Sequence, residues 1–304
     1  MSRITFSSSI AGTLFLLCLA TVPAEATVDH TYVSGKGTDT GGCATPAAAC
    51  RTFAYAITQT SASGIIIVID PADYAPVTIT KSISIVADGG GPAGIFGGTG
   101  TAITINAGSA VVNLRGLTLD GEGTAAFGIA LGSAGSLTIT DCVVRHFTLT
   151  GINLTPSGTL NFHILNTISS DSNIGLSATA SAGGAVQGVV DRFTATHDGG
   201  GIAIGPLAVV SVLNSVLSNN SAGLGVSGTN ATVSVRNSVA NNNTQTGFSA
   251  GAQGIMRLAN SMAIGNSQAG ISIAYATVFS YGDNEINGNG TDVSGGTLTS
   301  VAKR

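Results

Sequence analysis

The chain has 304 residues, of which 43% are hydrophobic and only 9% are charged, and its formal net charge is −4 at pH 7. The charged fraction is far below the usual quarter of a soluble globular protein, so uncharged polar residues must cover most of the surface. The net charge is negative and the sequence has no basic stripe, which excludes nucleic acid as a partner.

Residues 1–26 are predicted to be a signal peptide. Arg3 supplies its positive end, "IAGTLFLLCLA" (10–20) its apolar core, and "AEA" (24–26) the small residues before cleavage after Ala26. The apolar run is too short to cross a bilayer, and no later segment is apolar enough to do so. We therefore expect an exported, soluble protein of the periplasm, the cell surface or the extracellular space.

Residues 27–62 are expected to form an N-terminal cap. The stretch "CRTFAYAIT" (50–58) has the apolar spacing of a short amphipathic capping helix. An oxidising compartment favours a disulfide between Cys43 and Cys50. A zinc site would need two further ligands near these cysteines, but His30 is the only candidate there. We therefore predict no metal and no other cofactor. Cys142 is left over and is expected to be half-buried.

Residues 63–290 are expected to form the main domain, and residues 291–304 its last strand and cap. "GIIIVID" (64–70) predicts a buried strand, and "APVTITKSISIVAD" (75–88) predicts the first coil of an array. The glycine-rich stretch "DGGGPAGIFGGTG" (88–100) indicates a protruding loop. No linker divides the chain.

An Asn or Asp recurs at one position every 23 or 25 residues, most clearly in "VSVLNSVLSNN" (210–220) and "VSVRNSVANNN" (233–243). A Gly followed by an apolar residue opens each unit, and another Asn follows six residues after each of the last four central positions. Such spacing indicates an array whose units pack on their neighbours. The seven central positions are Asp141, Asn166, Asp191, Asn214, Asn237, Asn260 and Asp283.

The composition of the units identifies the kind of array. Leucine-rich repeats need several Leu in each unit, and Gly, Asn and β-branched residues argue against helical repeats. Alternating apolar residues broken by Gly and Asn turns are typical of strands. We therefore predict an all-β fold, a single-stranded right-handed parallel β-helix of about nine or ten rungs of about 23 residues.

The recurring Asn or Asp is interpreted as a ladder at a corner between two strands. Apolar residues two positions before and after it predict that its side chain faces inward. Each Asn amide can then bond the next one, about 4.8 Å away. Asp141, Asp191 and Asp283 are either ladder members or chemically active groups. The serines one position after the ladder are expected to face outward: Ser215, Ser238 and Ser261.

Several stretches resemble bacterial right-handed parallel β-helix repeat proteins of the pectin-lyase-like superfamily. They are "YVSGKGTDTGGC" (32–43), "CRTFAYAI" (50–57), "GIIIVIDPADYAPVTITKSISI" (64–85), the repeats and "YGDNEINGNGTDVSG" (281–295). This scaffold hosts polysaccharide lyases, glycosidases, epimerases, esterases and adhesins, so the resemblance implies a fold and no particular reaction. The sequence signatures of those enzymes are missing.

Charged residues on the outside of adjacent rungs are the place to look for a site. His146 and Asp171 each lie five residues past the ladder position in adjacent rungs, and Arg145 adjoins His146. A His–carboxylate pair could do acid–base work, or it could be a surface contact at a corner. His163 and Arg192 are weaker candidates for binding at outward positions.

The intact ladder and the missing catalytic signatures favour a non-catalytic protein, either structural or binding. Its expected partner is a polysaccharide or another component of the cell envelope. The alternative is a divergent polysaccharide lyase or glycoside hydrolase that uses Arg145, His146 and Asp171.

Overall fold

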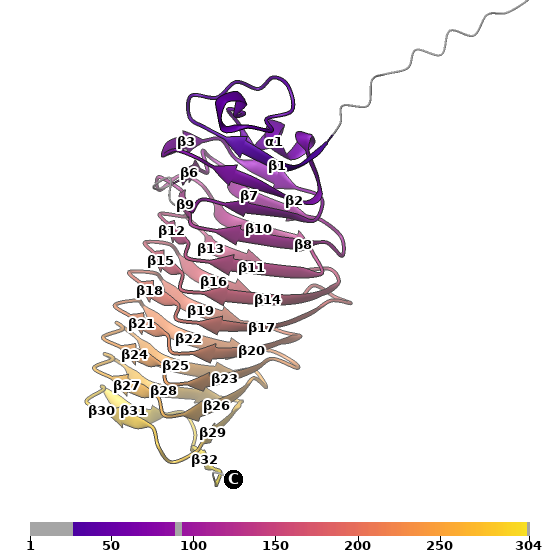
Figure 1. Ribbon diagram of the computed structural model, residues 1–304. Coiled ribbons are helices and arrows are strands. Elements are labelled where there is room, and N and C mark those ends of the chain that lie inside the picture. The colour runs from indigo at the N-terminus through magenta and orange to yellow at the C-terminus, as the bar shows by residue number, and fades with distance from the viewer. Residues whose placement is uncertain (1–26, 89–92, 303–304) are drawn as a thin grey trace, which may run out of the picture.

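The computed structural model describes residues 27–88 and 93–302, which form a parallel β-helix of about nine turns. Each turn passes through three parallel sheets that run the length of the molecule (Figure 1). The predicted all-β solenoid with one short helix is confirmed. The predicted signal peptide, 1–26, lies outside the described residues.

Sheet A has 12 strands in parallel register. It begins at β1 and ends at β32, so backbone pairing continues into both predicted caps. The strands in spatial order are β1 (Val28–Val33), β2 (Thr60–Val68), β5 (Ile83–Val86), β8 (Val111–Arg115), β11 (Ser136–Thr140), β14 (Thr159–Leu165), β17 (Ala185–Asp191), β20 (Ala208–Leu213), β23 (Thr232–Arg236), β26 (Ile255–Ala259), β29 (Thr277–Ser280) and β32 (Thr299–Ser300).

Sheet B has 10 short strands, and the candidate site lies at the C-terminal ends of neighbouring strands. The prediction of a loop over 88–100 is wrong in part, because Ala93–Phe96 pairs with the next rung as β6. The strands are β3 (Ala72–Tyr74), β6 (Ala93–Phe96), β9 (Leu117–Asp120), β12 (Val143–Arg145), β15 (Ile168–Ser170), β18 (Thr194–Thr196), β21 (Val216–Ser218), β24 (Val239–Asn241), β27 (Met262–Ile264) and β30 (Glu285–Asn287).

Sheet C completes each turn with 10 further strands. From β10 to β28 the second residue of each strand in this sheet is Gly, because the next rung comes too close for a side chain. A Cβ on Gly223 would lie 2.4 Å from the carbonyl oxygen of Gly247. The strands are β4 (Val77–Ile79), β7 (Thr101–Asn106), β10 (Phe127–Ser133), β13 (Thr150–Leu154), β16 (Ile174–Ala178), β19 (Gly200–Ile204), β22 (Ala222–Ser227), β25 (Thr246–Gly251), β28 (Ala269–Ala274) and β31 (Thr291–Ser294).

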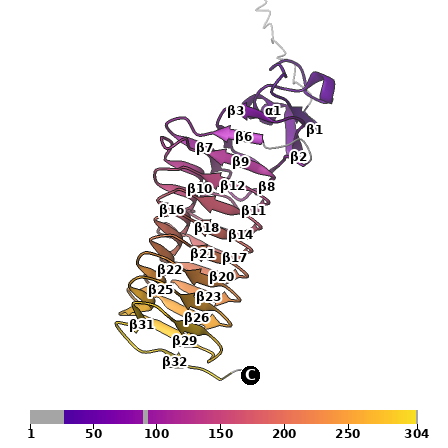
Figure 2. The same cartoon turned by 90° about the vertical axis from the view of Figure 1, so that its left-hand side faces the viewer.

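The capping helix α1 (Phe53–Gln59) lies over the N-terminal end of the solenoid (Figure 2). Thr52 caps it, because its hydroxyl oxygen accepts a hydrogen bond from the Tyr55 amide at 3.1 Å. Phe53 is fully buried and packs on Tyr74 in the first rung, with ring centroids 5.0 Å apart. The helix thus covers apolar residues that the first rung would otherwise expose.

The cysteines divide into one bridge and one buried thiol. The predicted disulfide between Cys43 and Cys50 is confirmed, with Cα atoms 5.4 Å apart, and it closes a loop that contains the 3₁₀ turn η1 (Pro46–Ala48). The prediction of a half-buried Cys142 is wrong, because it follows a corner residue and points into the core with 2% of its surface exposed. Burial raises the pKa of its thiol to about 11.

The predicted ladder forms, but its side chains point outward. Asn237 donates to Asn214 at 3.3 Å, and Asn260 donates to Asn237 at 2.8 Å. All three are exposed, and so is Asn166, which donates to Asp141. The inward prediction is therefore wrong. Two of the seven predicted members lie outside this column, because Arg192 and Gly282 hold the left-handed corner where Asp191 and Asp283 were predicted. We call the remaining five the outer ladder: Asp141, Asn166, Asn214, Asn237 and Asn260.

The orientation is reversed because the corner residue has left-handed backbone. Asn214 has φ of 49°, and Asn237 has φ of 50°. A left-handed residue breaks the alternation of a strand, so the next side chain, and not the one after it, faces the core. Ser215, Ser238 and Ser261 are consequently buried, contrary to the prediction, and each accepts a hydrogen bond from the amide of the preceding rung.

A second ladder lies inside the solenoid at the next corner. Asn243 is fully buried, and its Oδ1 accepts the backbone N–H of Asn220 at 3.0 Å. Its Nδ2 donates to the carbonyl oxygen of Leu217 at 3.1 Å. These bonds satisfy backbone groups that a corner would otherwise leave unpaired. The inner ladder consists of Asp198, Asn220, Asn243, Asn266 and Asn289.

Candidate functional site

The candidate site lies at the corner that follows sheet B, where each rung from β12 onward turns through a left-handed residue. In the C-terminal rungs this residue is Asn219, Asn242 or Gly265, types that accept a positive φ readily. The earlier rungs use His146 at φ 59° and Asp171 at φ 56° instead. In these rungs, ionisable side chains thus occupy the left-handed corner position that Asn and Gly adopt more readily.

Asp120, at the end of β9, is the centre of the cluster. Its Oδ2 accepts a hydrogen bond from Nε of Arg145 at 2.8 Å. Its Oδ1 lies 2.9 Å from Nδ1 of His146 and also accepts the backbone N–H of Glu122 at 2.9 Å. Only 11% of the Asp120 side chain is exposed, so the two neighbouring side chains cover it.

These contacts decide the charge of Asp120. Burial alone would raise the pKa of its carboxyl group, but hydrogen bonds from the Glu122 amide, His146 and Arg145 outweigh burial and lower the pKa below its usual value. Asp120 is therefore a carboxylate at neutral pH. Its oxygens accept hydrogen bonds and do not supply a proton.

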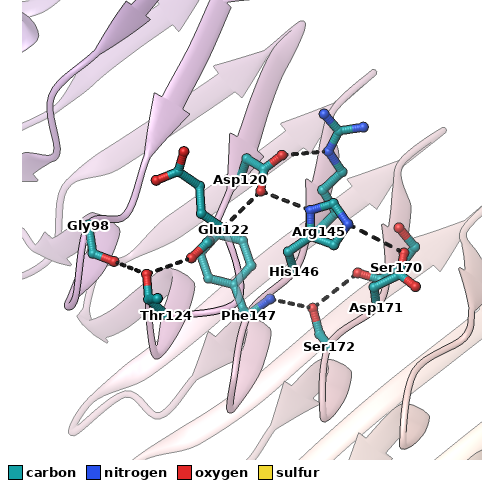
Figure 3. A network of polar contacts seen from close by, with 11 residues as sticks. Gly98, Asp120, Glu122, Thr124, Arg145, His146, Phe147, Ser170, Asp171 and Ser172 are labelled. Atoms are coloured by element: carbon teal, nitrogen blue, oxygen red, sulfur yellow. Dashed lines mark hydrogen bonds and ion pairs between the residues drawn. The ribbon is translucent and has the colours of Figure 1, made fainter.

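The ionised Asp120 determines the tautomer of His146. Because a carboxylate can only accept, Nδ1 of the imidazole carries the hydrogen and donates it. Nε2 is then directed away from Asp120, and it lies 3.9 Å from Oδ2 of Asp171 in the next rung (Figure 3). His146 and Asp171 thus come close without a direct hydrogen bond.

An open hollow with a volume of about 400 Å³ adjoins the imidazole. It is lined by Glu122, Gly123, His146 and Asp171. About half of the His146 and Asp171 side chains is exposed, at 44% and 48%. Across residues 27–88 and 93–302 no group of three or more His, Cys, Asp or Glu side chains is arranged to hold a metal ion. The hollow therefore offers hydrogen-bonding groups and charge.

The two weaker sequence candidates lie apart from this cluster. His163 is exposed on the outer face of β14, in sheet A. Arg192 follows β17, and its Nη1 lies 3.8 Å from Oδ2 of the neighbouring Asp191. The described part of the chain shows no contact that joins His163 to Arg192.

Sequence reasoning identified Arg145, His146 and Asp171 but missed Asp120, which holds the first two in place. The repeat did contain a signal, because a step of 25 residues back from Arg145 reaches Asp120, its partner in strand pairing. The irregular repeat before residue 126 concealed that step. Glu122 and Gly123 belong to the same irregular turn.

The sequence of residues 101–290 matches the family model described as a right-handed β-helix region. This match covers more than half of the chain and the rungs that carry the site. The chain belongs to this family, which makes the parallel solenoid of Figure 1 a right-handed β-helix. None of the curated proteins matches the sequence. No helix in the described residues is long and apolar enough to cross a membrane.

Two solved structures share the fold at low sequence identity. The A-module of the Azotobacter vinelandii mannuronan C-5 epimerase AlgE6 is 15% identical, with a TM-score of 0.51 over 79% of this chain and 89% of that one. Pectate lyase Pel9A is 14% identical, with a TM-score of 0.52 over 92% of this chain and 80% of that one. At such identities the similarity shows the pectin-lyase-like fold alone.

Proposed function

We propose that the protein is exported and binds polysaccharide in the hollow beside His146 without changing it chemically. The observation that carries the proposal is the preorganised edge of that hollow. Asp120 fixes His146 through a 2.9 Å contact, while about half of His146 and Asp171 stays exposed. Groups held in place before binding lose little conformational entropy when a ligand arrives.

Fixed donors and acceptors suit the hydroxyl groups of a sugar. Asp171 accepts hydrogen bonds, whereas Nε2 of neutral His146 accepts and that of the imidazolium donates. Successive rungs lie about 4.8 Å apart, so an elongated chain can follow the axis of the solenoid and meet similar groups repeatedly. The two structures with the same fold act on polysaccharides according to their names, which supports this ligand class.

The hydrogen bonds that Asp120 already forms favour binding over catalysis. Asp120 has hydrogen bonds at both oxygens and a lowered pKa, so it supplies no proton. The hollow is open to water, whereas electrostatic stabilisation of a transition state is strongest in a site that excludes water.

Proton transfer by His146 is the second candidate function. One observation favours it, namely that a buried carboxylate holds Nδ1 and leaves Nε2 facing the hollow, as in sites where a His acts as general base. In that case the protein would be a divergent polysaccharide lyase or hydrolase, with Asp171 as the second ionisable group.

One experiment separates the two functions. The purified protein is titrated calorimetrically with a panel of neutral and acidic oligosaccharides, and each mixture is assayed for new reducing ends and unsaturated uronates. We expect binding without products, and a tenfold or larger loss of affinity in His146→Ala. His163→Ala, which removes an exposed His far from Asp120, should bind like the wild type.

Two results would change the conclusion. Products that form with the wild type and disappear in His146→Ala would replace binding by proton transfer. Equal affinities of His146→Ala and the wild type would remove the hollow as the binding site. Export has its own test, because the mature protein recovered outside the cytoplasm should begin at Thr27. The confirmed disulfide supports that expectation.

A further inference from the structure

A second hollow lies on the outer face of sheet A, four rungs from the His146 cluster towards the C-terminus, with a volume of about 410 Å³. Its floor is Ala259, the last residue of β26. Arg236, in the preceding rung, pairs directly with Ala259, and Tyr281 follows β29 in the next rung. The small Ala259 between two large side chains creates the hollow.

Arg257 forms one side of the hollow. It lies two residues before Ala259, so both side chains are on the same face of β26. Its guanidinium carbon is 5.3 Å from the ring centroid of Phe279 in the next rung. This cation–π contact restrains the long side chain, which therefore loses less freedom when it binds a ligand.

The charges of this hollow are uncompensated. Arg115, Arg145 and Arg192 each form an ion pair with at least one aspartate. Arg236 and Arg257 have no such pair in the part of the chain that the structure describes. Two guanidinium groups that face one hollow without a carboxylate make a site for an anion.

We propose that this hollow binds an oxyanion carried on a sugar ring. The oxyanion would lie between the guanidinium groups of Arg236 and Arg257, which suit the planar geometry of a carboxylate. The ring would lie over Ala259 and against Tyr281. That a sugar carries the anion rests on the proposed function, whereas the anion site itself rests on these side chains alone.

The test uses the full mature protein and calorimetric titration with an oligogalacturonate. Its methyl ester has the same sugar rings without charge, and inorganic phosphate is an anion without the sugar. We expect affinity for the oligogalacturonate that is at least tenfold higher than for either of the other two probes. Arg236→Gln and Arg257→Gln should each reduce it at least tenfold, whereas Arg192→Gln, which removes an equal charge from a paired arginine, should not.

Ala259→Leu makes the test specific to the hollow, because it fills the floor and leaves every charge in place. We expect it to abolish binding at this site while circular dichroism and the melting temperature stay close to those of the wild type. Unchanged affinity in Ala259→Leu would overturn the proposal and leave general attraction to a basic surface. Equal affinity for phosphate and the oligogalacturonate would also overturn it.

The outcome is independent of the hollow beside His146. In the His146→Ala background, where the first hollow has lost its imidazole, Arg236→Gln and Arg257→Gln should still reduce the remaining affinity for the oligogalacturonate at least tenfold. If neither hollow binds an oligosaccharide, the proposed function fails. If Arg236→Gln and Arg257→Gln leave the affinity unchanged while His146→Ala still lowers it, only the second site is refuted.

Discussion

Asp198 interrupts the inner ladder, and its replacement by Asn is our most specific prediction. Its Oδ1 accepts the backbone N–H of Ser172 at 2.8 Å, as an Asn would. In the next rung, Nδ2 of Asn220 donates to the carbonyl oxygen of Ala195 at 3.0 Å. In Asp198 the atom that corresponds to Nδ2 of Asn220 is Oδ2, which in an ionised carboxylate cannot donate. This oxygen lies towards Ser169 without a well-formed hydrogen bond to any described residue.

The expected magnitude follows from the pKa. Asp198 is 3% exposed, and burial raises the pKa of its carboxyl group from 3.8 to about 7. A shift of about three units at about 1.4 kcal/mol each corresponds to about 4 kcal/mol of stability. Below pH 4 both the folded and the unfolded chain are protonated, and the cost is absent. Between pH 4 and 7 only the unfolded chain ionises, so the free energy of unfolding falls, and above pH 7 the full cost remains.

The assay is guanidinium unfolding of the wild type and Asp198→Asn between pH 4 and 8. We expect nearly equal free energies of unfolding at pH 4 and an advantage of about 4 kcal/mol for Asp198→Asn at pH 8. Asp88→Asn is the matched control, because this aspartate is about half exposed, and its curve should stay close to that of the wild type. Parallel curves for Asp198→Asn and the wild type at every pH would refute the reasoning.

Three further changes test the fold. Asn243→Ala should lower the free energy of unfolding by about 3 kcal/mol in chemical unfolding, because it leaves buried groups of the inner ladder unpaired. Asn260→Ala, on the exposed outer ladder, should lower it by less than about 1 kcal/mol. Equal losses would contradict the inward and outward orientations of the two ladders. Gly223→Ala should lower the melting temperature, at a cost of about 2 kcal/mol, because its Cβ would meet the carbonyl oxygen of Gly247, and an unchanged melting temperature would argue against that contact. Reduction of the disulfide should cost about 2 kcal/mol, measured by unfolding with and without reductant, and a Cys43→Ser variant should show no response to reductant.

The repeat was enough to predict the fold, because a parallel β-helix places every unit in the same environment. The same residue types therefore recur at each corner, and their spacing is visible without coordinates. Cys43 and Cys50 could be paired for a similar reason, since a short loop joins them and the expected compartment is oxidising.

The orientation of the corners could not be read from the sequence. Alternation of apolar residues predicted that Asn214 faces inward, but its left-handed backbone reverses the alternation, and Ser215 is the buried residue. The sequence contains both Asn columns and nothing in it says which one is inside. Backbone dihedral angles at single residues decide that, and they depend on how neighbouring rungs stack.

The sites also required the tertiary structure. Asp120 and His146 are 26 residues apart, and they meet because β9 and β12 pair in parallel register through an irregular turn. Arg236, Arg257 and Tyr281 are unremarkable in the sequence, yet they surround one alanine once three rungs are stacked. The sequence by itself determined the repeating scaffold, because local periodicity encodes each rung. Only stacking of the rungs decided which side chains share a hollow, because contacts between rungs join residues that no local pattern connects.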